Sequence, residues 1–203
     1  MYDALFAALE EAEAKDQLAT ARVLYAKMMK LDGEPPLKLL AAENLIELHQ
    51  HGQAEQLLLQ VEEVVGTEGG GELRAGLLAQ KGNLARARGE NEEAEKCYRA
   101  AHQLEPENTG LLLAAAEVSV RQGETAKAEF LVRKALEDPA YEGEALFQLG
   151  TLFAAGERWD EALEAFGRCA HVDPENEVAE LWVEDLEEAL EVLNGRVENG
   201  GEE

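Results

Sequence analysis

Basic residues are scarce in this chain, and their scarcity argues against two classes of partner. The 203 residues include 43 Asp and Glu but only 18 Lys and Arg, which gives a formal net charge of −25 at pH 7. Such a surface repels the phosphates of nucleic acids and the headgroups of anionic lipids. We therefore expect neither a nucleic-acid nor a membrane partner, and we expect the net charge to attract basic partners.

Cysteine is also rare, and long apolar runs are absent. Cys97 and Cys169 are the two cysteines, and their wide separation favours two reduced core thiols over a disulfide. No apolar run reaches the length of a membrane span. Residues 1–15 lack the basic region and the unbroken apolar stretch of a signal peptide. These absences predict a cytoplasmic location, unless a targeting segment has been removed.

Aromatic residues and prolines are few, which narrows the fold class. Aromatics make up 5% of the chain and there are five prolines, whereas Ala, Leu and Glu abound. This composition is typical of stacked helices, because small residues let neighbouring helices approach closely and few prolines interrupt them. We therefore expect an all-α protein.

One stretch, residues 146–174, carries an ordered motif. It reads LFQLGTLFAAGERWDEALEAFGRCAHVDP. The pattern large-x2-Leu-Gly-x2-aromatic, then Ala-x3-Phe, then Pro is formed by Leu146, Leu149, Gly150, Phe153, Ala162, Phe166 and Pro174. It resembles the tetratricopeptide repeat, a helix-turn-helix unit of 34 residues. The resemblance implies a right-handed α-α superhelix, in which each helix pair stacks on the next.

Equivalent residues of this motif recur 34 residues apart in two earlier repeats, and we call each set of equivalent positions a column. The clearest are Gly82, Ala116 and Gly150; Ala94, Ala128 and Ala162; and Tyr98, Val132 and Phe166. Two more degenerate repeats precede them. Gly52 lies 37 residues before Gly89, so we place three extra residues in the glycine-rich loop 66–71. The expected helix pairs are 2–14 with 17–30, 37–50 with 53–65, 72–88 with 91–104, 108–121 with 125–137, and 141–155 with 159–171.

The predicted organisation is one solenoid domain over residues 1–195. Its five repeats span about 2–35, 38–71, 75–108, 109–142 and 143–176. A capping helix over 177–193 follows, apolar on one stripe and acidic on its other face, as a terminal repeat requires for solubility. We expect Asn194 and Gly195 to end this helix and residues 196–203 to form a disordered acidic tail.

The sequence carries no recognisable catalytic or metal-binding motif. It has no HExxH, no phosphate-binding glycine loop and no nucleophile elbow. His49 and His51 bracket one residue, but no second His or Cys cluster could complete a zinc site with them. We therefore expect no enzyme activity, no cofactor and no metal.

The resemblance further implies that the first helices of successive repeats line a concave groove. The residues that we predict to bind a protein or peptide there are Ile46, Ala79, Asn83, Arg86, Leu113, Glu117, Phe147 and Thr151. Leu113 and Phe147 would be the bulky apolar anchors. Alternatively, these side chains pack against neighbouring repeats or the capping helix.

The predicted function is a non-catalytic scaffold or adaptor that binds a protein segment in this groove. We expect the segment to carry apolar anchors and basic charge, and the chain to be a monomer or a weak homodimer. Two alternatives stay open: a chaperone-like holder of a secretion or assembly client, and a self-associating structural module. Some family members clamp acidic tails with Lys, Asn and Arg, but only Asn83 and Arg86 fit that chemistry here, and Glu117 opposes it.

Overall fold

The computed structural model describes residues 35–68 and 70–199. The predicted first helix pair, over 2–14 and 17–30, lies outside the described residues. The chain divides into two compact units, residues 1–111 and 112–203, and each is described by itself. The single solenoid domain over 1–195 stays a prediction.

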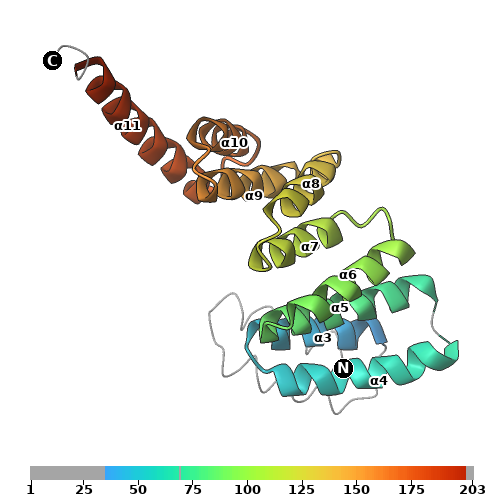
Figure 1. Cartoon of the computed structure of the whole chain (residues 1–203). Helices are drawn as coiled ribbons and strands as arrows, with labels where there is room; N and C mark the ends of the chain where they lie inside the picture. The colour runs from blue at the N-terminus through green and yellow to red at the C-terminus, as the bar shows by residue number, and fades with distance from the viewer. Residues whose placement is uncertain (1–34, 69, 200–203) are drawn as a thin grey trace. The chain divides into compact units, whose positions relative to one another are not determined.

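The described part of the first unit consists of two helix pairs. These are α3 (Pro35–Glu47) with α4 (His51–Glu68), and α5 (Gly71–Arg88) with α6 (Asn91–Leu104). Figure 1 shows the partners of each pair lying side by side. Their core contains buried alanine, leucine and valine from α3 and α4, together with Leu77 and Leu84 of α5.

The second unit has two further pairs and a long last helix. It contains α7 (Gly110–Arg121), α8 (Thr125–Ala135), the 3-10 turn η1 (Pro139–Tyr141), α9 (Glu142–Ala155), α10 (Trp159–Val172) and α11 (Glu177–Asn199). Helix and turn account for the regular structure throughout the described ranges, with no strand among them. The all-α fold class is therefore confirmed.

Size complementarity between paired helices explains the repeat columns. A Cβ added to Gly82 would lie 2.6 Å from the Tyr98 ring, and one added to Gly150 would lie 2.6 Å from the Phe166 ring. A large ring on the second helix therefore requires glycine on the first. In the fourth repeat, buried Ala116 takes the position of the glycine and buried Val132 takes the position of the ring. Alanine is larger than glycine and valine is smaller than an aromatic ring, so the combined volume of the pair changes little.

The turn between α3 and α4 differs from the prediction. Gly52 was expected at this turn, but it lies inside α4, and His49 takes the left-handed conformation with φ 56°. The equivalent residue after α5 is Gly89, with φ 78°. His49 precedes Gly89 by 40 residues, so this repeat carries six extra residues, and the predicted three was wrong. The fully buried Ala54 and Ala94 keep the same separation of 40 residues.

The turn between α9 and α10 shows the same substitution of a side chain for glycine. Gly156 was expected to make this turn, yet its φ is −91°, and Glu157 is the left-handed residue with φ 57°. Gly123 fills that column one repeat earlier, with φ 77°. The left-handed position is thus a property of the repeat register, while glycine occupies it in only some repeats.

Helix α11 begins at a side-chain cap and runs further than predicted. The Asn176 side-chain oxygen accepts a hydrogen bond from the Ala179 backbone N–H at 3.1 Å, so Asn176 caps the N-terminus of this helix. The Trp182 ring stacks on Phe166 with 5.2 Å between ring centroids and 8° between planes. The helix continues through Asn194 and Gly195 to Asn199, so the predicted end at residue 193 was wrong.

Candidate interaction groove

An open groove lies between α7 and α9 of the second unit. Its volume is about 560 Å³. Two helices supply the lining, which consists of Ala116, Glu117, Val120, Arg121, Glu144, Phe147, Gln148, Thr151, Leu152 and Ala155. Positions three and four apart on each helix recur in this set, because they share one helix face. The groove is therefore formed by the first helices of two successive repeats.

The apolar part of the groove rests on a packed base. The Phe147 ring meets the buried Phe166 ring edge-on, with 5.6 Å between centroids, and this contact fixes its orientation. Leu113 is fully buried in the core against which Phe147 packs. Val120 remains 47% exposed on the α7 wall, so it offers apolar surface that an occupant could cover.

Two carboxylates give the groove its charge. Partial desolvation raises the pKa of Glu144, and the nearby charge of Glu117 raises it further. The negative charge of Glu117 thus makes Glu144 more costly to ionise. A bound Lys or Arg side chain would relieve that cost, whereas an acidic ligand would add to it.

The structure brings together three of the eight predicted site residues: Glu117, Phe147 and Thr151 line the groove. The Thr151 hydroxyl donates to the Phe147 backbone carbonyl at 3.0 Å, so that hydrogen is already engaged within the helix. Leu113 contributes to the core beneath the groove, and Ile46 is buried in the core of the first unit.

The other three predicted residues lie on α5 of the first unit, where all are half-buried: Ala79, Asn83 and Arg86. Asn83 is already hydrogen-bonded inside the protein. Its side-chain oxygen accepts from the Tyr98 hydroxyl at 2.7 Å, and its amide donates to Gln80 at 3.0 Å. These bonds tie Asn83 to its own helix pair, so its capacity for a ligand is reduced. Its role in binding stays a prediction.

The list of predicted site residues did not include Glu144 and Val120, which matter most among the other residues that line the groove. Both occupy repeat positions that face the concave side in the tetratricopeptide pattern, and that pattern already assigns Val120 to the groove face. Arg121, Gln148, Leu152 and Ala155 lie between those positions, and the spacing of the pattern does not indicate them. They line the groove because α7 and α9 lie close enough for neighbouring faces to meet.

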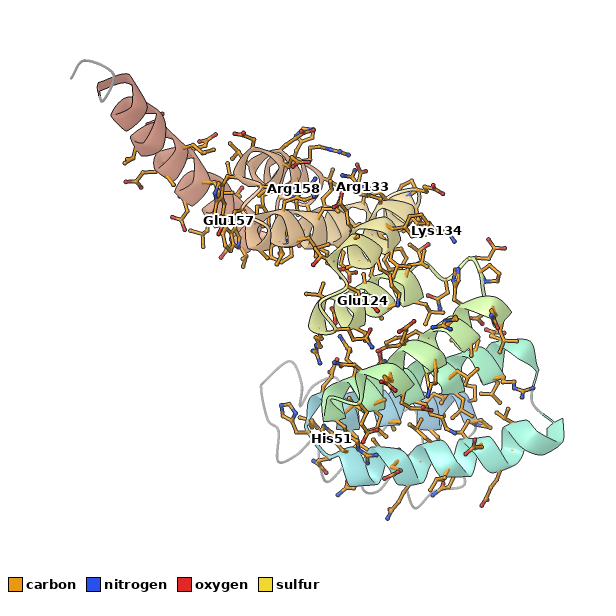
Figure 2. All side chains as sticks on the ribbon, viewed as in Figure 1. His51, Glu124, Arg133, Lys134, Glu157 and Arg158 are labelled. Carbon is orange, nitrogen blue, oxygen red and sulfur yellow. The ribbon has the colours of Figure 1, made fainter. Side chains whose placement is uncertain are left out.

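A charged cluster at α8 and the start of α10 serves packing. Arg133 and Arg158 each pair with Glu129 at 2.8 Å, and both guanidinium groups lie over the Phe153 ring, at 5.7 and 4.3 Å from its centroid. Figure 2 labels the two arginines on this side of the unit. The ion pairs hold two repeats together through one carboxylate.

Neither cysteine lines the groove, and both are poor nucleophiles. Cys97 and Cys169 are free and buried. Burial raises the pKa of both thiols, and nearby carboxylates raise it further, so the thiolate form is disfavoured. The expectation of inert core thiols agrees with this environment.

Comparisons with known proteins identify the repeat family. Residues 85–140 match the tetratricopeptide repeat family. A segment of 104 residues is 30% identical to anaphase-promoting complex subunit 7 of Arabidopsis thaliana, and the match covers 51% of this chain and 18% of that protein. The chain therefore spans about a fifth of the length of this curated relative.

Solved structures share the fold. A thermophilic tetratricopeptide-repeat protein of Thermus thermophilus matches with a TM-score of 0.66 at 20% identity, over 92% of this chain and 98% of that one. The first tetratricopeptide repeat domain of Spaghetti (RPAP3), solved bound to the HSP90 peptide SRMEEVD, matches with a TM-score of 0.54 at 25% identity, over 59% of this chain and 97% of that one. Residues 85–140 therefore match tetratricopeptide repeats in sequence, and the chain shares the fold of solved tetratricopeptide-repeat proteins.

None of the helices in the described ranges combines the length and apolarity that crossing a bilayer requires.

Proposed function

We propose that this protein is a non-catalytic interaction scaffold that binds a segment of a partner protein in the α7–α9 groove. The observation that carries the proposal is the groove itself, with an apolar surface at Phe147 and Val120 beside two carboxylates. Its location on the first helices of two repeats supports a peptide site, since a similar domain is solved with a peptide bound.

The charge of the groove favours a basic segment. The HSP90 peptide bound by the similar domain contains two glutamates and an aspartate. Such a peptide would here meet Glu117, Glu144 and a net charge of −25. A segment with apolar anchors and Lys or Arg fits better, because the groove carboxylates would pair with it and the net charge would speed its encounter.

A synthetic peptide pair tests this proposal. The probe is a short fluorescein-labelled peptide of leucine and lysine, and the control replaces every leucine by serine at the same charge. Fluorescence anisotropy should show tighter binding of the leucine peptide. Replacing both Glu117 and Glu144 with glutamine should weaken it and reduce its salt dependence. Equal affinity for both peptides would mean that net charge alone attracts them, and it would contradict an apolar binding site in the groove.

Two further properties belong to the same proposal. We infer a cytoplasmic location from the two free, buried thiols, which suit a reducing compartment. A chaperone-like holder would bind in the same groove but would copurify with one obligate client, so the isolation of client-free protein separates it from an adaptor.

A further inference from the structure

Helix α11 exposes an apolar stripe that its own fold leaves uncovered. The stripe consists of Val178, Leu181, Trp182, Ala189 and Val192. Their spacing places them on one face of the helix. Val178 is 51% exposed, Leu181 58%, Trp182 37% and Val192 48%. Asp185 lies on the same face and divides the stripe into an apolar segment at 178–182 and another at 189–192, which together extend over about four helical turns.

The other faces of α11 have different roles. Ala179 and Leu186 are buried and form the face that packs against the rest of the unit. The side of the stripe opposite this packing face carries an acidic row of Glu177, Glu180, Glu184, Glu188 and Glu191. Residues 177–192 contain no Lys or Arg. The stripe therefore runs between a packed face and a face with uncompensated negative charge.

We propose that this stripe is a second interaction surface, which binds an amphipathic helix of a partner protein. The partner helix would place apolar residues on the stripe and Lys or Arg opposite the acidic row. Charge complementarity supports this occupant, because a neutral or acidic helix would leave five glutamates facing apolar surface or like charge. No α11 residue lines the α7–α9 groove, so the two surfaces are separate.

Two other occupants fit the stripe less well. The second helix of another repeat would pack on the column of Gly82 and Gly150, which on α11 is Glu184 in the acidic row, so it would lie beside the stripe and not on it. A second copy of α11 would bring its own acidic row beside this one. Repulsion between like charges then opposes self-association at neutral pH.

Trp182 gives the stripe a preorganised anchor. Its indole stacks on the buried Phe166 ring, so its orientation is set before a partner arrives. Tryptophan is among the residue types enriched in binding hot spots, and a preorganised side chain loses less conformational freedom on binding. Beyond Trp182, α11 extends past α9 and α10 (Figure 1), so a partner helix can approach the stripe along its length.

Trp182 also supplies the measurement. Replacing Trp159 with phenylalanine in the full chain leaves Trp182 as the one tryptophan, since the sequence contains two. In this background, Val120→Glu is included to weaken peptide binding in the α7–α9 groove. Titration with an unlabelled peptide of leucine and lysine, patterned as an amphipathic helix, should change the Trp182 emission. Adding Leu181→Glu should weaken this binding about tenfold or more, while adding Phe130→Glu on α8, where Phe130 is 67% exposed, should not.

Three outcomes would overturn the proposal. The first is unchanged affinity with Leu181→Glu, and the second is equal binding of a peptide with serine in place of leucine. The third is a concentration-dependent dimer in sedimentation that Leu181→Glu abolishes, which would assign the stripe to a second copy. Because every variant in this series carries Val120→Glu, a loss of affinity on adding Leu181→Glu reports on the stripe and not on the groove.

Discussion

Replacing Gly150 with alanine tests the packing rule that organises the repeats. The new methyl group would lie 2.6 Å from the Phe166 ring, well inside van der Waals contact. That ring cannot move aside, because Trp182 stacks on it and Phe147 meets it edge-on. Overpacking of this kind costs about 1–3 kcal/mol. The change also removes a helical glycine, which contributes about 1 kcal/mol in the opposite direction. We expect a net loss of up to about 2 kcal/mol.

Gly167 on α10 provides the matched control. It lies inside a helix like Gly150, but a Cβ there meets nothing within 4 Å. Gly167→Ala should therefore stabilise the protein by about 0.5–1 kcal/mol. The same substitution thus has opposite signs at two helical sites, and the difference isolates the contact with Phe166.

The chain itself suggests a rescue of Gly150→Ala. In the fourth repeat the glycine and ring columns hold Ala116 and Val132, so Gly150→Ala with Phe166→Val copies a combination that the fold already contains. Denaturant unfolding should show the double variant losing less free energy of unfolding than the sum of the single variants, by about 1–2 kcal/mol. Additive losses, or stabilisation by Gly150→Ala alone, would refute the packing rule.

Three further predictions concern stability. Ala128→Trp should lower the free energy of unfolding by about 1–3 kcal/mol or more, because Ala128 is fully buried; melting like wild type would contradict the register. Asn176→Ala removes the hydrogen bond that begins α11 and should cost about 0.5–2 kcal/mol, with denaturant unfolding as the measurement. The folded state raises the pKa of Glu144, so its contribution to stability is greatest below the unfolded pKa and falls as pH rises through the folded pKa. Glu144→Gln should therefore stabilise the protein at neutral pH, and the gain should vanish in acid; a pH-independent gain would exclude titration as its cause.

Repeat spacing closely predicted the helices from α5 to α10. Columns such as Gly82 and Gly150 are set by direct packing against Tyr98 and Phe166, so they are visible in the sequence at fixed separation. The identity of the turn residue is less constrained. The two flanking helices fix the left-handed backbone conformation at this position, so residues other than glycine can occupy it. His49 occupies that position in place of a glycine, which explains the misplaced turn.

The candidate site could be predicted only in part. Column positions identify which residues share a helix face, and Glu117, Phe147 and Thr151, which such positions selected, line the groove between α7 and α9. Depth depends on the size of the neighbours, and Leu113 is buried beneath Phe147 rather than exposed beside it. Likewise, α11 passes Asn194 and Gly195, because these residues lower helix propensity without preventing a helix.

The affinity of the leucine–lysine peptide for Val120→Glu tests the central claim most directly. Val120 lines the groove and is 47% exposed, so the new carboxylate should weaken binding about tenfold or more with little change in melting temperature. Phe130→Glu is the matched control, because Phe130 is more exposed and lies outside the groove; it should bind and melt like wild type. Equal affinity of both variants for the peptide, at unchanged melting temperatures, would contradict binding in the α7–α9 groove.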